Sequence, residues 1–406
     1  MKTSRSNFLR FVAHQWSVLL AMSFGSALAH IATSGMPLQV GALMDGTART
    51  PSQAGLFAFI QVASLSLGMI LLSLLVARIK PLQIAIAGAL QAALGDLGLY
   101  VAREFTVQLV LGGIAGLGFG LAYSATISAG ATSNDTDRAY AVGVGGSLLL
   151  VVLIMTILPF TAAQLGPLGV FACMAGFALL CMPIFLGFKG ASIQTRTRPH
   201  PAHSAGWRSP GTAGLLFSWA AFSTGTAMAY VFAERIGRNI QLTPTDIGLV
   251  LSSGVFLGVL GTALAGVFSQ LLDRRVALVG GLAGSALACF LIGHATTLVS
   301  FGAGIFSYWI FTMFLYCILL GTAAVLDETG RLGTLGSGTE RLGYGIGAWI
   351  GGMLAQHVSY TSTGTFGCAV CVAGIIVGYP TLFRALSRRG SEAIGVKQAL
   401  FFDDCA

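Results

Sequence analysis

Apolar residues fill most of the chain in long runs that short polar segments separate. A run of roughly 17 to 25 apolar residues is long enough to cross a bilayer as an α-helix. Twelve such runs can be counted, at 15–38, 53–77, 81–101, 105–130, 139–162, 167–188, 211–233, 245–270, 276–295, 298–326, 341–357 and 364–385. The pattern therefore predicts an all-α integral membrane protein with twelve transmembrane helices.

Composition agrees with this class. Hydrophobic residues make up 55% of the 406 residues and charged residues only 9%, whereas about a quarter of a soluble domain is charged. The net charge of +8 belongs to no compact basic domain, so no nucleic-acid partner is expected. With both termini in the cytoplasm, every Lys and Arg lies on the cytoplasmic side except Arg49, Arg103, Arg235 and Arg238. The positive-inside rule thus predicts a multi-pass cell membrane protein with cytoplasmic termini, as in a bacterial inner membrane.

The N-terminus also resembles a secretory signal peptide. Basic residues precede the first apolar run, and Ala27-Leu28-Ala29 is similar to a cleavage site. The hydrophobic character continues to Val40, well beyond that site. We therefore expect an uncleaved first helix, with a cleaved signal peptide as the alternative.

An internal repeat divides the chain. The segment TPSQAGL at 50–56 recurs as TPTDIGL at 243–249, 193 positions later, and Arg138 matches Arg331 at the same offset. Thr50 and Thr243 are expected to be N-caps of capping boxes that start the second helix of each half. We expect six-helix bundles at 1–188 and 211–390, a basic cytoplasmic linker at 189–210 and a cytoplasmic tail at 391–406.

Twelve spans, a six-plus-six duplication and a basic central loop resemble the major facilitator superfamily of secondary transporters. The segment GVFSQLLDRR at 266–275 is similar to the signature loop of that family: Gly266, Arg274 and Arg275 fit the pattern, whereas Gln270 and Asp273 depart from it. The resemblance implies two parallel repeats that move around a substrate site near the middle of the membrane. It also implies that helices one, four, seven and ten line that site.

Those four helices carry polar and aromatic residues at helical spacing. Polar atoms in lipid go unsatisfied, so these residues should face protein or water. Interhelical hydrogen bonding is the alternative role for each Ser or Thr. The residues that we expect to bind substrate are His30, Ser34, Tyr123, Phe222, Thr226, Tyr230, Tyr308, Thr312 and Tyr316.

Two ionisable residues are candidates for proton coupling. His30 lies near the middle of its span, where an ionisable group suggests a functional role and where imidazole can titrate. A neutral histidine bonded between helices is the alternative. Glu234 follows Tyr230 by four residues at the outer end of helix seven. Glu234 is either a proton-binding group or an interfacial anchor, and Arg235 and Arg238 are expected to face headgroups or solvent.

Charged residues that recur in both halves suggest a cytoplasmic gate formed by Asp135, Arg138, Asp327 and Arg331. Solvated loops are the alternative, and Glu340 and Arg341 are further candidates for this gate. The core of the spans is expected to contain no Lys or Arg, which argues against phosphate esters and di-acids as substrates.

The function predicted from these features is secondary transport. The chain has no GxxxxGK[ST] motif, so ATP is not the expected energy source. It has no HExxH pattern or paired intramembrane acids, so no enzyme activity, metal or cofactor is expected. Proton-coupled symport of a small amphipathic compound, such as an aromatic or short organic acid, is the leading hypothesis. Drug or metabolite efflux by proton antiport and a non-transporting membrane protein are the alternatives. We expect a monomer whose partners are substrate, protons and lipid.

Overall fold

The chain folds into a bundle of long helices. The computed structural model describes residues 2–75, 80–130, 136–190, 210–326 and 331–378, with 380, 382 and 384. Within these ranges the ordered elements are all helical. The prediction of an all-α membrane fold is therefore confirmed. The expected tail at 391–406 and nearly all of the expected linker lie outside the described residues.

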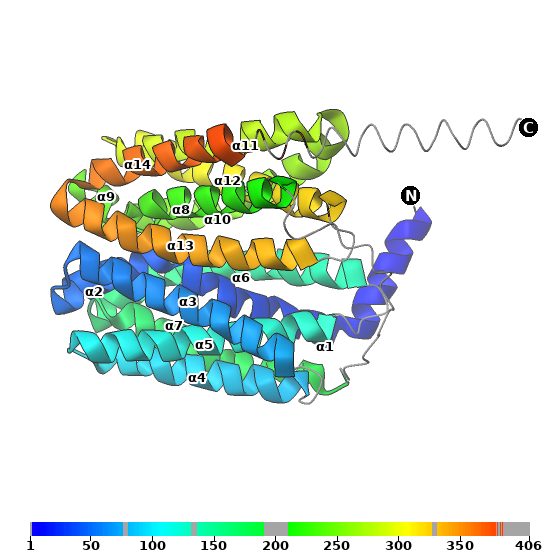
Figure 1. Cartoon of the computed structure of the whole chain (residues 1–406). Coiled ribbons are helices and arrows are strands. Elements are labelled where there is room, and N and C mark those ends of the chain that lie inside the picture. Colours follow the sequence, from blue (N-terminus) through cyan, green and yellow to red (C-terminus); the bar gives the residue numbers. More distant parts are fainter. Residues whose placement is uncertain are drawn as a thin grey trace, which may run out of the picture.

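The first half of the chain forms one layer of the bundle, which lies at the bottom of Figure 1. Its helices are α1 (Lys2–Ser34), α2 (Met36–Thr47), α3 (Pro51–Leu75), α4 (Pro81–Val101), α5 (Phe105–Gly130), α6 (Thr136–Leu165) and α7 (Gly169–Ile184), followed by the 3-10 turn Phe185–Gly190.

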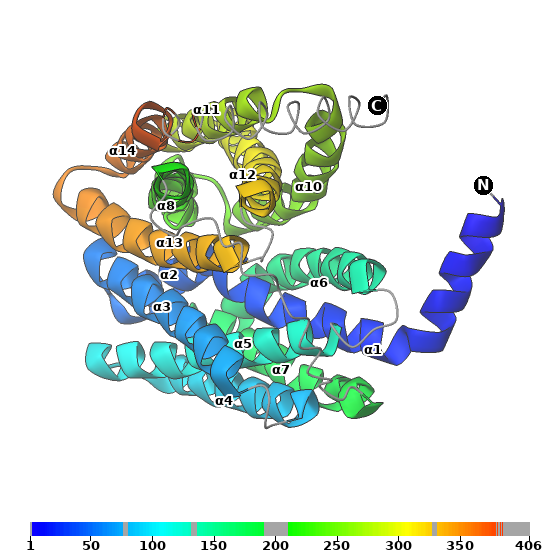
Figure 2. The ribbon, with the colours of Figure 1, turned by 45° about the vertical axis from the view of Figure 1, so that its right-hand side comes forward.

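The second half forms the other layer, and the 45° turn of Figure 2 shows the same two groups of helices. Its helices are α8 (Pro210–Tyr230), α9 (Ala233–Asn239), α10 (Pro244–Leu271), α11 (Arg274–Gly293), α12 (Leu298–Leu326), α13 (Arg331–His357) and α14 (Tyr360–Ala373), followed by the π-helical turn Gly374–Gly378.

Eleven helical segments of the described chain are long and apolar enough to cross a membrane. The predicted span that is missing from these eleven is the one at 341–357, which falls on α13. The first ten residues of this helix, RLGTLGSGTE, are mostly glycine and polar residues. This helix has 27 residues and packs along α3 and α8. The predicted arrangement of twelve helices therefore holds approximately, with α13 as the most polar member.

The predicted capping boxes are present in both halves. The Gln53 amide donates to the Thr50 hydroxyl at 3.3 Å, and the Thr50 amide donates back to Gln53 Oε1 at 3.1 Å. In the second half the Asp246 amide donates to the Thr243 hydroxyl at 3.1 Å. Each box satisfies a backbone N–H at the start of α3 or α10, so both helices begin where the sequence predicted.

The first helix of each half is interrupted near one end. Gly35 separates α1 from α2, and two turn residues separate α8 from α9. The sequence predicted one continuous span at 15–38, but Pro37 stands in the first turn of α2, where a helix can begin without an N–H. The two short helices lie at the same end of the bundle, on the left of Figure 1. We call it the α2/α9 end.

Glycines allow the helices around α13 to approach closely. A Cβ on Gly352 would lie 2.5 Å from the Pro51 carbonyl oxygen, and one on Gly347 would collide with the Thr224 carbonyl oxygen. The glycine-rich segment 342–352 therefore packs α13 against α3 of the other half and against α8 of its own half.

Candidate functional site

A cavity of about 220 Å³ lies between the two halves. We call it the central cavity. Its lining comes from α1, α5 and α6 of the first half and from α8, α10, α12 and α13 of the second. The lining includes every residue that the sequence suggested for substrate binding: His30, Ser34, Tyr123, Phe222, Thr226, Tyr230, Tyr308, Thr312 and Tyr316. Their contact with a substrate remains a prediction, but their convergence on one space is a structural observation.

His30 stands on the wall formed by the first half. Its Nδ1 lies 3.3 Å from the Ser147 hydroxyl on α6, and its ring is tilted against Tyr123 on α5 with centroids 5.6 Å apart. The hydroxyl of Thr33 donates to the His30 carbonyl at 3.1 Å. His30 therefore both lines the cavity and joins helices of its own half, so the proton-binding and structural roles both stay compatible with its position.

Aromatic rings form the opposite wall. Tyr230 on α8 and Tyr308 on α12 stack with centroids 4.2 Å apart and an interplanar angle of 2°. Trp309 packs edge-on to both rings. These rings give the cavity a large, flat apolar surface, which suits a planar organic group.

Two tyrosine hydroxyls join the halves beside this wall. Tyr230 donates to the Ser34 carbonyl at 2.8 Å, and Tyr344 on α13 donates to the Thr33 carbonyl at 3.1 Å. Both acceptors lie in the last turn of α1, directly before the break at Gly35. The interrupted helix thus provides free carbonyl oxygens that bind the second half.

The cavity also contains an ion pair that the sequence analysis missed. Arg341 and Glu340 on α13 line the cavity, and Arg341 Nε lies 3.3 Å from Glu340 Oε2. The expectation that no Lys or Arg occupies the core of the spans is therefore wrong. So is the suggested place of these two residues at the cytoplasmic gate.

The error came from the predicted start of this helix. The sequence placed it at 341, because the preceding residues are polar, but α13 begins at Arg331. The repeat contained the correct signal. The corresponding helix of the first half was predicted from 139, and the offset of 193 positions moves that start to 332. Glu340 then corresponds to Ser147, the residue that contacts His30.

A second constellation of charges lies at the α2/α9 end. It consists of Asp45, Glu234, Arg235 and Arg238, and we call it the four-charge cluster. Arg235 donates to both carboxylate oxygens of Asp45 at 2.8 and 2.7 Å and to the Gly41 carbonyl at 2.9 Å. Glu234 lies 2.7 Å from Arg235 Nε and 3.0 Å from Arg238 Nε. The cluster therefore joins α2 of the first half to α9 of the second.

These contacts correct the expected position of Arg235. The sequence directed it toward headgroups or solvent, and consecutive helical residues, which point about 100° apart, need not pair. Instead, its side chain is 14% exposed and forms ion pairs with two carboxylates. The reason is tertiary: α2 lies against α9, so Asp45 completes a forked pair with the guanidinium. Arg238 also lies 3.9 Å from Asp45.

The charge state of Asp45 depends on its neighbours. Partial burial raises the pKa of this carboxyl, but the Arg235 hydrogen bond and the charges of Arg235 and Arg238 outweigh that effect. The pKa of Asp45 therefore lies below its ordinary value. Its carboxylate is ionised at neutral pH, and the ion pair is intact there.

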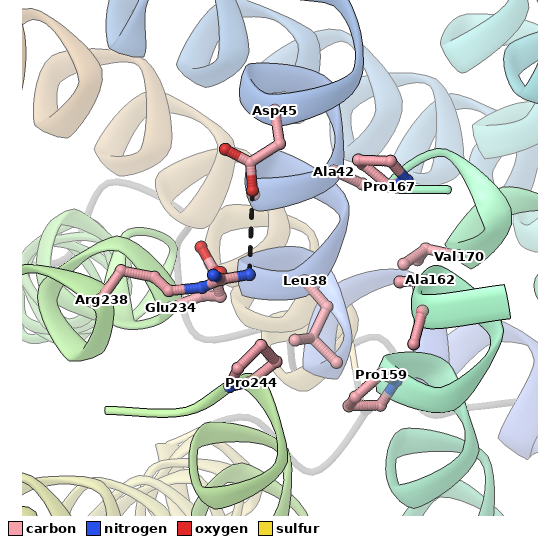
Figure 3. A pocket seen from close by; sticks show the side chains of 12 residues that line it. Leu38, Ala42, Asp45, Pro159, Ala162, Pro167, Val170, Glu234, Arg238 and Pro244 are labelled. Atoms are coloured by element: carbon pink, nitrogen blue, oxygen red, sulfur yellow. Dashed lines mark hydrogen bonds and ion pairs between the residues drawn. The ribbon is translucent and has the colours of Figure 1, made fainter. Parts of the chain in front are cut away.

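A smaller pocket of about 160 Å³ adjoins the four-charge cluster. Figure 3 shows Asp45 and Arg238 facing one another beside it, with Pro159 and Ala162 of α6 across the pocket. Glu234 lines this pocket and not the central cavity. The two candidates for proton coupling, His30 and Glu234, thus occupy different spaces.

The predicted cytoplasmic gate can be located only in part. Asp135 and Asp327 lie outside the described residues, and Arg138 and Arg331 lie in the first turns of α6 and α13 without described side chains. The gate therefore stays a prediction. Within the described ranges, no group of three or more His, Cys, Asp or Glu residues could hold a metal ion.

Comparison with known proteins finds similarity in structure but not in sequence. No protein-family model and no curated protein matches the chain. A crystal structure of the nucleoside transporter NupG aligns with a TM-score of 0.74 at 10% identity, covering 90% of this chain and 99% of that one. A structure of the peptide transporter POT aligns with a TM-score of 0.71 at 14% identity, covering 91% and 94%.

A bacterial homologue of the human lysosomal transporter Spinster, in an inward-facing, unoccupied conformation, also aligns, with a TM-score of 0.67 at 12% identity over 91% of this chain and 96% of that one. All three are transporters of one fold. The agreement extends over nine-tenths of the chain and therefore covers both layers of the bundle. The chain therefore has the fold of the major facilitator superfamily of transporters.

Proposed function

We propose that the protein is a proton-coupled secondary transporter of a small amphipathic organic compound, with aromatic and short organic acids as the first candidates. The observation that carries this proposal is the central cavity, which both halves line with aromatic rings, hydroxyls, one histidine and one ion pair. Such a lining would surround an apolar body and meet one polar or charged group. Since both halves line the central cavity, a movement of one half relative to the other would change the side of the membrane from which the cavity can be reached.

The contacts at the α2/α9 end support an inward-facing state. With cytoplasmic termini, this end lies at the outer surface of a bacterial inner membrane. The four-charge cluster and the hydroxyls of Tyr230 and Tyr344 would then keep the outer side closed. Opening this side requires these contacts to separate, so the four-charge cluster acts as the outer gate in the proposed cycle.

Proton coupling is assigned to Glu234 and His30 in this proposal. Protonation of Glu234 would neutralise the carboxylate that pairs with Arg235 and Arg238 and would thereby weaken the outer gate. His30 lies in the central cavity, where it can respond to occupancy. The protein would work as a monomer, since one chain contains both halves of the cavity.

The test is transport in proteoliposomes that contain the purified chain. A panel of aromatic acids, amino acids and cationic dyes is offered with and without an imposed pH gradient. We expect an organic acid to accumulate when the outside is acidic and to equilibrate without the gradient. Dye extrusion driven by the gradient would instead indicate efflux by antiport, and no transport of any compound would contradict the proposed function.

A further inference from the structure

Glu340 and Arg341 lie in an unusual place for two charged residues. Nine residues of α13 precede Glu340, so the pair lies about 15 Å along the helix at a rise of 1.5 Å per residue. Their side chains are only 16% and 18% exposed. Charged groups at such depth are costly, and in membrane proteins they mark substrate or ion pathways.

The guanidinium of Arg341 has more donors than partners. It carries five N–H donors, and the structure gives it two polar partners among the described residues. Nη1 donates to the Thr33 hydroxyl at 3.3 Å, and Nε faces Glu340 Oε2 at 3.3 Å. Since Arg341 lines the central cavity, its other donors can meet a ligand there.

A carboxylate from a ligand can replace Glu340 as the partner of Arg341. A forked pair, with two parallel N–H···O contacts, is the strong arrangement between a guanidinium and a carboxylate. Consecutive helical residues point about 100° apart. The closest contact between Glu340 and Arg341 is 3.3 Å, longer than the 2.7 Å of the forked Arg235–Asp45 pair. A carboxylate that is free in the cavity can approach Arg341 with both oxygens and form the better pair.

We propose that Arg341 binds the carboxylate of an aromatic monocarboxylate and that Glu340, displaced from Arg341, takes up the proton that accompanies this anion in the central cavity, whereas protonation of Glu234 acts on the outer gate. This inference rests on the proposed function and names its substrate class. The displaced Glu340 would be an unpaired charge in a mostly apolar cavity, where protonation removes the cost. One anion and one proton then enter the cavity together, so the bound load is electrically neutral.

The remaining groups of the cavity suit this exchange. Glu340 is the acidic residue of the described lining, and the stacked Tyr230 and Tyr308 rings would hold the aromatic body. Thr312 on α12 has a buried hydroxyl oxygen without a partner, which is available for a further polar atom of the ligand. The other titratable groups that face the cavity are His30, Tyr123, Tyr230, Tyr308, Tyr316, Tyr344 and Cys317.

His30 is the other candidate for proton binding in this set, so the experiment must separate it from Glu340. The probes are benzoate, its neutral isostere benzamide, and benzylammonium. Binding to the purified full chain is measured by isothermal titration between pH 6 and 9, where benzoate stays ionised. Proton uptake is measured in two buffers of different ionisation enthalpy.

We expect benzoate to bind with uptake of about one proton, so that its Kd rises about tenfold per pH unit. In Glu340→Gln benzoate should bind with an affinity independent of pH, and counterflow exchange should persist while accumulation driven by a pH gradient is lost. Glu340→Asp should restore the pH dependence. In His30→Gln the Kd of benzoate should still rise about tenfold per pH unit, even if its value at a given pH changes.

Arg341→Gln should weaken benzoate binding at least tenfold and leave benzamide binding unchanged, which also shows that the variant is folded. Arg341→Lys keeps the charge but loses the fork, and it should give an intermediate loss. The inference is overturned if benzoate does not bind, if Arg341→Gln binds it normally, or if Glu340→Gln keeps the pH slope. If the binding results hold but no compound crosses the membrane, the proposed transport function is wrong, whereas the binding site at Arg341 and Glu340 is still supported.

Discussion

At the scale of single residues, Asp45 shows how one carboxylate can hold a closed state. Its pKa lies below the ordinary value because Arg235 and Arg238 outweigh the effect of burial. The stabilisation of the closed end is therefore complete above the ordinary pKa and is lost as pH falls through the lowered one. The pair is partly exposed, so we expect a contribution of about 1 kcal/mol.

Asp45→Asn should accordingly open the α2/α9 end more often. A cysteine at Ser34, in a background without the native cysteines, should react several-fold faster with an impermeant thiol reagent from that side. The ratio of the variant rate to the parent rate should fall toward one at acidic pH, where Asp45 of the parent is protonated as well; the slower reaction of the thiol at low pH cancels in this ratio. Asp246→Asn is the matched control, because Asp246 lies in the first turn of α10 at the same end and bonds to its N-cap Thr243, without an ion pair to the other half among the described contacts. Equal labelling rates in the parent and in both variants would show that Asp45 does not keep the α2/α9 end closed.

Glu234 leads to a second prediction at this scale. Glu234→Gln mimics the protonated carboxyl, so substrate exchange should continue while accumulation driven by the pH gradient is lost. Arg235→Gln weakens the same gate without removing the titrating group, and it should retain accumulation at a reduced rate. Uptake of radiolabelled substrate in proteoliposomes separates the two. Undiminished accumulation in Glu234→Gln would leave this residue a structural role only.

At the scale of elements, the packing of α13 against its neighbours depends on particular glycines. A Cβ on Gly347 would collide with the Thr224 carbonyl oxygen of α8, whereas one on Gly338 of the same helix would meet nothing within 4 Å. Gly347→Ala should therefore destabilise the protein by about 1–3 kcal/mol and lower its thermal midpoint in detergent by several degrees.

Gly338→Ala is the control for that prediction. Replacing a helical glycine by alanine favours the helix by about 1 kcal/mol, so this variant should melt at the parent temperature or slightly above it. The difference between the two variants isolates helix contact from helix propensity. Similar midpoints would mean that α8 and α13 separate easily, and the close approach would then be unimportant for stability.

At the scale of the whole molecule, alternating access needs a second gate at the end opposite the four-charge cluster. Arg138 and Arg331, which the repeat relates, are the proposed residues of that gate. Arg138→Gln and Arg331→Gln should each favour the inward-facing state, so a cavity cysteine at Ser34 should become less accessible from the outer side. The amount of folded protein should not change. Unchanged accessibility in both variants would leave these arginines as topology signals.

The sequence alone determined the features that depend on local geometry. A bilayer fixes the length of an apolar run, and the helical period places residues three or four apart on one face. The helical period explains why each helix contributes a stripe, and the resemblance to the major facilitator superfamily implied that four such helices surround one site. In the structure the residues from His30 to Tyr316 line one cavity. The capping boxes were also predictable, because donor and acceptor lie three residues apart.

Only the tertiary structure decided which charges meet. Asp45 and Arg235 are 190 positions apart, and nothing in the neighbourhood of either residue indicates the other. The break at Gly35 and the close packing of α2 against α9 bring them together. Arg341 was misplaced for a related reason. The polar start of α13 is tolerated in the bundle because protein and cavity surround it, and a criterion based on contact with lipid therefore starts the helix too late. Periodicity is a property of one segment, whereas an ion pair or a cavity is a property of several segments packed together.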